Sequence, residues 1–240
     1  MGLKHTVFSF TRQDVQDVYS TVIKSIETYD PNTVRAAIPM YILTHKIAKE
    51  TDVRVILSGE GADELFHGYN CFRHAPTASD AKSEAARLVQ NLHMFDLLRA
   101  ERCFSSACLE IRVPFLDQNL VQYVQSLDAN LIGGRSKRYA EKQLLRDAFA
   151  YITDLASLRI LDRPKERFSD GCGFSYVPQL LSDISGDLPI LSDKLKAEKN
   201  RAHHILDEFY PNNRHLVVSR TMPSWASVPT DGNLLAMHLE

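Results

Sequence analysis

The chain has 240 residues, of which 44% are hydrophobic and 24% are charged, a composition typical of a globular protein with a sizeable core rather than of a disordered or fibrous one. Its formal net charge of -2 gives no general attraction to nucleic acid or to anionic membranes, so we expect neither as a partner. No apolar run approaches the roughly 20 residues that cross a bilayer, and the first residues lack the apolar core of a signal peptide, which predicts a cytoplasmic protein.

The first predicted element is a short strand at residues 6–10, where apolar and aromatic side chains partly alternate. Thr11 then offers a helix N-cap, with an acidic residue three positions further on. The helix that follows is expected to end near Tyr29, because the Asp-Pro pair at residues 30–31 disfavours its continuation. A second helix is predicted over about residues 39–49, with its proline tolerated in the first turn.

Residues 53–57 form the next predicted strand. They are a nearly continuous apolar, β-branched run, which is typical of a strand covered on both faces of a parallel sheet. The strand ends in a glycine-containing loop at residues 58–64, after which apolar residues resume. The order of strand, helix, strand and glycine loop indicates an α/β sheet.

Helical periodicity dominates the chain after this loop. Apolar side chains recur on one face over residues 85–95, 120–127 and 144–149, which predicts three helices. A last helix is expected around residues 205–209, and residues 216–240 are interpreted as loop. We therefore predict an α/β protein whose parallel sheet is followed by a mostly helical part.

The loop at residues 58–64 carries the strongest chemical signal. Two glycines flank Glu60 and allow the backbone to turn sharply and approach a ligand, so that its amides could hold a phosphate. Glu60, Asp63 and Glu64 would repel a polyphosphate unless a cation such as Mg²⁺ lay between them. The alternative is that these acids only favour the N-terminus of a helix through its dipole, and their spacing leaves both interpretations open.

Residues 58–69, SGEGADELFHGY, resemble the signature SGEGADELFGGY of glutamine-hydrolysing asparagine synthetases, with His67 in place of a glycine. Further segments match the family in the same order, namely residues 27–30, 33–36, 97–102, 109–117 and 163–171. Collinear agreement over most of residues 1–180 is highly specific. The chain therefore looks like the C-terminal synthetase domain of this family, a branch of the N-type ATP pyrophosphatases.

The resemblance implies an incomplete Rossmann-like parallel sheet of the adenine nucleotide alpha-hydrolase type. A partial synthetase domain would cover residues 1–187, with an α/β part at about 1–78 and a helical part at about 79–187, and a helix and loop tail would follow at 188–240. The implied activity is that of asparagine synthetase, with ATP as a substrate and Mg²⁺. ATP would adenylate the β-carboxylate of aspartate and release pyrophosphate, and ammonia would then displace AMP.

The family's residue roles carry over by motif. The resemblance implies nucleotide binding for Ser58, Gly59 and Gly61, catalysis for Glu60 and Lys165, magnesium binding for Asp63, and substrate binding for Arg112 and Asp117. Glu60 would accept a proton from the attacking nitrogen, and Lys165 would stabilise charge on the α-phosphate. The alternatives are an ion pair between Arg112 and Asp117 that fixes the intervening turn, and a solvated surface position for Lys165.

Two features of the family do not occur in this sequence. No cysteine precedes Cys71, whereas the amide-hydrolysing domain uses an N-terminal cysteine, so ammonia, free or glutamine-derived, would come from elsewhere. No SGGLDS-type pyrophosphate loop occurs either, so we expect unpaired sheet edges and exposed apolar surface.

Three hypotheses follow from these departures. The chain could act with another polypeptide that supplies the missing part, or as a homo-oligomer. It could instead be a catalytically inactive relative that binds a nucleotide or a synthetase, which the bulky His67 favours slightly. A different ligase or hydrolase on the same fold is disfavoured by the number of matching motifs.

Overall fold

The structure is a computed structural model that describes residues 2, 4–132, 141–152, 159–163, 165, 168–172, 176–186, 190–212, 216–218 and 221–225. The helices and strands are, in chain order, α1 (Arg12–Ile26), α2 (Pro31–Glu50), β1 (Val55–Leu57), α3 (Ala62–Leu65), η1 (Asn70–His74), α4 (Ala78–Asn91), η2 (Leu92–Met94), α5 (Asp96–Ser106), β2 (Glu110–Arg112), η3 (Pro114–Leu116), α6 (Gln118–Ser126), α7 (Ala129–Ile132), α8 (Gln143–Phe149), η4 (Ile160–Asp162), α10 (Phe168–Gly171), α11 (Tyr176–Ser185) and α12 (Leu191–Phe209).

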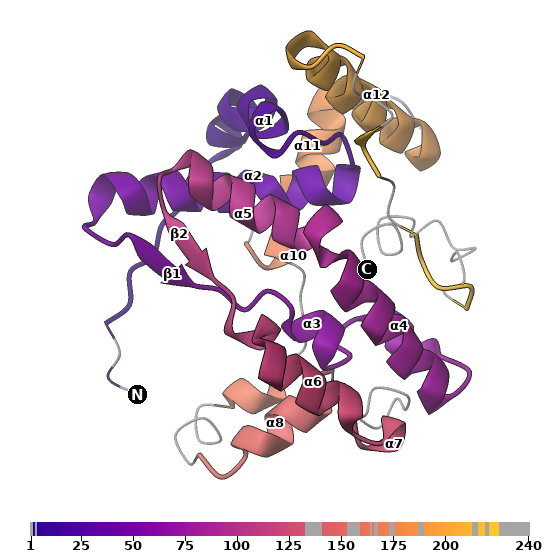
Figure 1. Ribbon diagram of the computed structural model, residues 1–240. Helices are drawn as coiled ribbons and strands as arrows, with labels where there is room; N and C mark the ends of the chain where they lie inside the picture. The colour runs from indigo at the N-terminus through magenta and orange to yellow at the C-terminus, as the bar shows by residue number, and fades with distance from the viewer. Residues whose placement is uncertain are drawn as a thin grey trace.

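The two strands lie between two groups of helices (Figure 1). In the view of that figure α1, α2, α5, α11 and α12 lie above the strands, and α3, α6, α7 and α8 lie below them. The predicted α/β class with a parallel sheet and a mostly helical remainder is therefore confirmed. In the part of the chain that the structure describes, no helix is both long and apolar enough to cross a membrane.

The structure of the first 26 residues differs from two predictions. The predicted strand at residues 6–10 is wrong, since this segment has no regular secondary structure. Thr11 does cap α1, with its side chain and that of Asp14 forming the reciprocal bonds of a capping box, but α1 ends at Ile26, before the predicted Tyr29.

The second helix begins earlier than the sequence suggested. α2 starts at Pro31, and the predicted start near Pro39 is wrong because Pro39 lies inside the helix. The Asp30 carboxylate accepts a hydrogen bond from the Thr33 amide at 2.9 Å, and a proline in the first helical position needs no amide partner. The Asp-Pro pair therefore begins one helix rather than only ending another.

The sheet is small and partly exposed. β1 and β2 pair in parallel, with Val55 opposite Glu110 and Leu57 opposite Arg112. The expectation that β1 is covered on both faces is wrong, because Val55 is 41% exposed and Leu57 is 71% exposed. Ile56 of β1 and Ile111 of β2 pack against the helices, whereas Val55 and Leu57 leave the exposed apolar surface that was expected beside the sheet.

The largest cluster of buried side chains joins the first two helices to the last two. Val22 and Ile23 of α1 pack with Ile38 of α2, and the same cluster contains Leu181 of α11 and Ile205 of α12. Inside this part of the fold Arg35 Nε donates to Glu198 Oε1 at 2.7 Å, and both side chains are only 1% exposed. A buried ion pair thus ties α2 to α12.

Two smaller clusters lie nearer the glycine loop. The cluster around η1 and α4 consists of Cys71, Phe72, Ala75, Ala81 and Ala85, and Tyr69, Leu88, Met222 and Trp225 pack against it. The other consists of Leu65, Phe66, Val124 and Ile132. The part of the chain that follows the loop is therefore anchored in two packed apolar clusters.

Candidate functional site

The glycine loop begins at the carboxyl ends of both strands. It follows β1 and leads into α3, and the Ser58 amide donates to the Arg112 carbonyl at 2.8 Å. Arg112 is the last residue of β2, and the segment that leads from it to Asp117 therefore leaves the sheet at the same edge as the loop. This edge is where open α/β sheets place their ligands.

The glycines of the loop have different structural roles. Gly61 has φ +90°, and a Cβ there would lie 2.4 Å from Leu116 Cδ2, so both backbone conformation and space require glycine. Gly59 has open space around the position of a Cβ. Gly59 itself is exposed, and its carbonyl accepts a hydrogen bond from the Ala62 amide at 3.3 Å.

Glu60 is held by a cation that the residue roles above do not include. Arg99 Nη2 donates to Glu60 Oε1 at 2.6 Å, and Arg99 Nη1 donates to Asp96 Oδ1 at 3.0 Å. Burial raises the pKa of Glu60, and the nearby Arg99 opposes that rise. A carboxylate with these neighbours is suited to exchange a proton during a reaction.

The other two acids of the loop point to different partners. Lys142 Nζ lies 2.6 Å from Asp63 Oδ1, in a pair that is about one quarter exposed at each side chain. Glu64 is 3% exposed and accepts a hydrogen bond from the Tyr69 hydroxyl. Burial, with the nearby charge of Asp96, raises the pKa of Glu64 to about 7. The three acids therefore occupy three distinct environments and do not form one carboxylate cluster.

Lys165 contacts Tyr69, the last residue of the segment at residues 58–69 that resembles the family signature. Its Nζ lies 4.6 Å from the centroid of the Tyr69 ring, and the side chain is half-buried. A cation over the face of an aromatic ring is a stabilising contact. The Lys165 side chain thus lies against the Tyr69 ring and is not fully exposed.

Arg112 and Asp117 do not pair with each other in the described contacts. Arg112 Nε donates to Glu110 Oε1 at 2.7 Å, and both side chains are mostly exposed. Asp117 caps α6 by accepting from the Asn119 amide at 3.0 Å. The alternative of an ion pair that fixes the turn is therefore wrong, and the Arg112 guanidinium remains accessible at the sheet edge.

The fit to Mg²⁺ rests on one carboxylate. Among the described residues no group of three or more acidic, histidine or cysteine side chains could hold a metal ion. Magnesium at nucleotide sites commonly takes one or two carboxylates together with phosphate oxygens and waters. Asp63 fits such a site, with Lys142 as the cation that now occupies its carboxylate.

His67, the departure from the signature, does not line an open space. It has φ +56°, is 1% exposed, and its ring stacks on Phe72 with centroids 4.4 Å apart. A positive φ explains why glycine suits this position in the signature. The histidine ring instead packs on Phe72, a member of the cluster around η1 and α4.

The main residues missed from the sequence are cations and their neighbours. Arg99 lies in the segment at residues 97–102 that matches the family, and Lys142 lies among several basic residues, but the sequence assigns no individual role to either. Neither pattern specifies a contact across 39 or 79 residues of sequence. Tyr69 belongs to the signature itself, but only the fold shows its contacts with Glu64 and Lys165.

The fold and the site together define an α/β protein whose glycine loop lies at the carboxyl edge of parallel strands, among acidic and basic side chains. The sequence model of the asparagine synthase family matches residues 1–88 and 75–237. The chain therefore belongs to the asparagine synthase family.

Relatives with curated names agree with this membership. The chain is 42% identical to a probable glutamine-hydrolysing asparagine synthetase of Acanthamoeba polyphaga mimivirus, over 93% of the chain and 42% of that protein. It is 38% identical to the glutamine-hydrolysing asparagine synthetase of Gallus gallus, over 94% of the chain and 42% of that protein. A probable asparagine synthetase of Dictyostelium discoideum is 34% identical over 98% of the chain and 45% of its own length. The chain thus spans less than half the length of these relatives.

Proposed function

We propose that this chain takes part in the ATP-dependent amidation of aspartate, as the synthetase part of an asparagine synthetase. The observation that carries the proposal is the convergence of Arg99, Lys142 and Lys165, from separate segments, on the residues of the glycine loop and its continuation. Adenylation needs cations beside the phosphates, which Lys142 and Lys165 would supply, and the second step needs a fixed proton acceptor, which Arg99 provides by holding Glu60.

The nucleotide would lie on the loop. Ser58, Gly59 and Gly61 would present backbone to the phosphates, and Lys165 would stabilise charge on the α-phosphate as it is attacked. Asp63, released from Lys142, would contribute a carboxylate to Mg²⁺, which supplies further charge neutralisation when it is bound. Arg112, with its planar guanidinium, would bind a substrate carboxylate, and Asp117 at the start of α6 would also contact the substrate.

Glu60 would handle the proton of the second step. An oxygen of the aspartate β-carboxylate first forms a bond to the α-phosphorus of ATP, and pyrophosphate leaves. Ammonia then attacks the β-carbonyl carbon, the bond from that carbon to the AMP oxygen breaks, and a proton of the nitrogen passes to the Glu60 carboxylate. Arg99 would keep that carboxylate in place for the transfer.

Ammonia would come either free or from glutamine hydrolysed by another polypeptide. We also propose that the nucleotide site is completed by an SGGLDS-type loop outside these 240 residues, which a second polypeptide or a homo-oligomeric arrangement could present. A cytoplasmic location is part of the same proposal.

The test is a reconstitution assay. Pyrophosphate release is measured with aspartate, ammonia, ATP and Mg²⁺, for the chain alone and with an added polypeptide that carries an SGGLDS-type loop. We expect little release from the chain alone, rescue by the added polypeptide, and loss of rescue in Glu60→Ala and Lys165→Ala. Rescue that survives both substitutions would contradict the proposed roles.

A second candidate function is nucleotide binding or synthetase binding without catalysis. It is favoured by the internal pairing of charges at the site, since Glu60, Asp63 and Arg112 all have partners in the chain. In the same assay this function predicts binding of a nucleotide or of the added polypeptide with no release of pyrophosphate.

A further inference from the structure

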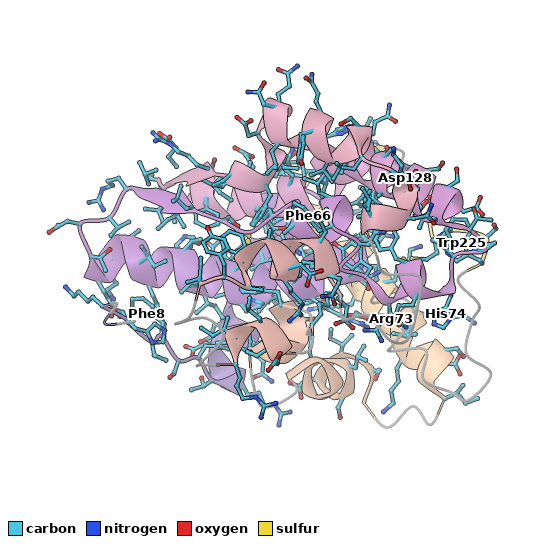
Figure 2. All side chains as sticks on the ribbon, turned by 90° about the horizontal axis from the view of Figure 1, so that it is seen from below. Phe8, Phe66, Arg73, His74, Asp128 and Trp225 are labelled. Atoms are coloured by element: carbon cyan, nitrogen blue, oxygen red, sulfur yellow. The ribbon has the colours of Figure 1, made fainter. Side chains whose placement is uncertain are left out.

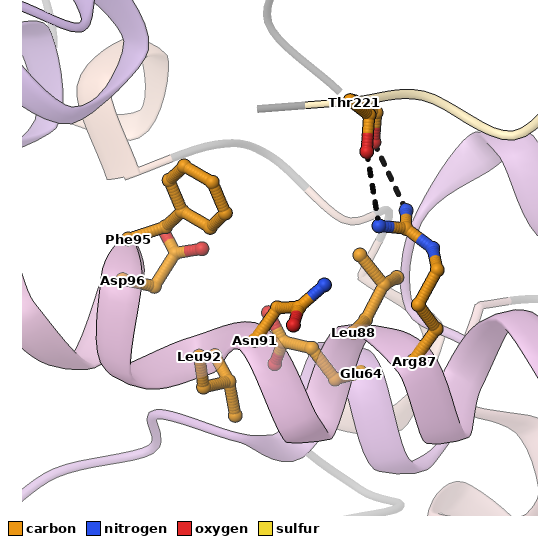
Figure 3. A pocket seen from close by; sticks show the side chains of 8 residues that line it. All are labelled: Glu64, Arg87, Leu88, Asn91, Leu92, Phe95, Asp96 and Thr221. Atoms are coloured by element: carbon orange, nitrogen blue, oxygen red, sulfur yellow. Dashed lines mark hydrogen bonds between the residues drawn. The ribbon is translucent and has the colours of Figure 1, made fainter. Parts of the chain in front are cut away.

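The C-terminal segment at residues 221–225 contacts α4 and η1, the elements that follow the glycine loop and α3 in the chain. Arg87 of α4 donates to the Thr221 hydroxyl at 3.1 Å and to the Thr221 carbonyl at 2.9 Å, as Figure 3 shows. Four residues later, Trp225 Nε1 donates to the Cys71 carbonyl at 3.1 Å. We call this segment the strap, since it is bonded at both ends to elements more than 130 residues earlier in the chain.

The strap also packs against the same elements, η1 and α4, to which it is hydrogen-bonded. Met222 and Trp225 lie against the cluster around η1 and α4, and Figure 2 shows Trp225 at the same end of the molecule as Arg73 and His74 of η1. Tyr69, which immediately precedes η1, packs against the same cluster. The strap and Tyr69 therefore share one set of apolar partners.

Tyr69 links that cluster to the candidate site. Its hydroxyl donates to Glu64, and its ring carries the Lys165 ammonium at 4.6 Å. Its ring is also nearly parallel to that of Phe72 in the cluster, with an interplanar angle of 17° and centroids 6.3 Å apart. A shift of the cluster would thus move the platform beneath Lys165.

Thr221 also closes a small cavity beside Glu64. The cavity, of about 10 Å³, has room for a single water-sized molecule, and Glu64, Asn91, Asp96 and Thr221 are among its lining residues (Figure 3). The strap thus contributes to the lining of a cavity that Glu64, the hydrogen-bond partner of Tyr69, also lines.

We propose that the strap is a positioning element of the candidate site: it fixes Tyr69, and Tyr69 in turn positions Lys165 and Glu64, the last residue of the glycine loop. This inference rests on the proposed function in one respect: the substrates on which Lys165 and Glu64 would act are those of the proposed reaction. The proposal assigns a role to the C-terminal segment, which is distant in sequence from every segment that matches the family.

The test is acetylation of lysine side chains by a water-soluble reagent, followed by peptide mass spectrometry, on the whole chain without nucleotide. Lys24 serves as an internal control, since its Nζ lies 4.8 Å from the Phe209 ring centroid in a similar contact elsewhere in the fold. Trp225→Ala should raise the acetylation rate of Lys165 by about threefold or more, because the cluster holding Tyr69 loses packing and a hydrogen bond, and it should leave Lys24 unchanged.

Two further variants make the result decisive. Tyr69→Leu should raise the rate of Lys165 by a similar factor, and Trp225→Ala should add little to Tyr69→Leu, because the two residues act in series. Leu216→Ala, at a 65% exposed position outside the strap, should change neither lysine. If Trp225→Ala raises Lys24 as well and so has unfolded, Trp225→Phe decides, since it keeps a ring but loses the bond to Cys71 and should raise Lys165 alone by about twofold.

An unchanged Lys165 rate in the folded strap variants, or fully additive effects of Trp225→Ala and Tyr69→Leu, would overturn the proposal. Both results are independent of catalysis, because no nucleotide is present. A failure of pyrophosphate release would therefore count against the proposed function alone.

Discussion

The Arg99 guanidinium bridges Glu60 of the glycine loop and Asp96 at the start of α5, with distances of 2.6 Å and 3.0 Å. α5 is itself packed in the largest apolar cluster through Ala100, Cys103 and Phe104. The position of the candidate proton acceptor is thus set by a rigid helix rather than by the loop alone.

Replacing Arg99 should destabilise the fold strongly. Arg99→Met leaves two largely buried carboxylates without their cation, so the free energy of unfolding in urea should fall by roughly 3–5 kcal/mol. Arg102→Met is the matched control on the same helix, since Arg102 and its partner Glu27 are 28% and 49% exposed, and should cost less than about 1 kcal/mol. Equal losses for the two variants would contradict the account of the bridge.

Glu64 should make stability depend on pH. Its pKa of about 7 in the folded chain lies above the ordinary value of 4.5, so the folded state binds more protons than the unfolded state between these values. Stability contributed by the protonated carboxyl is present below pH 4.5 and is lost as the pH rises through about 7.

Glu64→Gln removes this dependence, because the amide does not ionise. The free energy of unfolding of the unmodified chain should fall relative to that of Glu64→Gln as the pH rises, by at most about 1.4 kcal/mol per pH unit. Asp63, Asp96 and Tyr69 remain as the neighbours of Glu64 in both proteins. Parallel stability curves for the two proteins would show that Glu64 has no raised pKa.

The two glycines beside Glu60 should respond differently to alanine. Gly61→Ala places a Cβ 2.4 Å from Leu116 Cδ2 at a φ of +90°, and should lower the free energy of unfolding by about 1–3 kcal/mol. Gly59→Ala meets no atom within 4 Å and should change it by less than about 0.5 kcal/mol. If the loop binds phosphates through its backbone, Gly59→Ala should still weaken ATP binding, measured by equilibrium dialysis.

Substitutions on the exposed face of β1 should affect the binding of a second polypeptide without affecting the stability of the fold. Leu57→Thr, at a 71% exposed position, should change the free energy of unfolding by less than about 0.5 kcal/mol, whereas Ile56→Ala should cost about 2 kcal/mol because Ile56 packs against the largest cluster. If a second polypeptide completes the sheet, Leu57→Thr should weaken its binding in sedimentation or calorimetry. Unchanged binding would place the contact elsewhere.

Local signals in the sequence predicted local structure well. The capping box at Thr11, the faces of α6 and α8, and a strand leading into a glycine loop all depend on residues close in sequence. The strand predicted at residues 6–10 failed because a strand needs a partner, which no short pattern specifies. The Asp-Pro pair at residues 30–31 was misread because it can end one helix and begin the next.

The sequence predicted only the part of the candidate site that consists of residues close together in the chain. The signature identified the loop, but the partners of its acids, Arg99 and Lys142, come from distant segments, and the strap at residues 221–225 has no motif at all. Long-range pairing of charges and packing of a tail depend on the whole fold, so only the structure reveals them.

The most direct test of the proposed chemistry follows one oxygen atom. Aspartate labelled with heavy oxygen in its β-carboxylate is incubated with ATP, ammonia, Mg²⁺, the chain and the polypeptide that carries the SGGLDS-type loop, and the AMP formed is examined by mass spectrometry. Because the carboxylate oxygen bonds to phosphorus and the carbon–oxygen bond later breaks, we predict one labelled oxygen in AMP, and none of this product with Glu60→Ala or Lys165→Ala. Unlabelled AMP, or ADP and phosphate in its place, would contradict the proposal that this chain activates aspartate by adenylation.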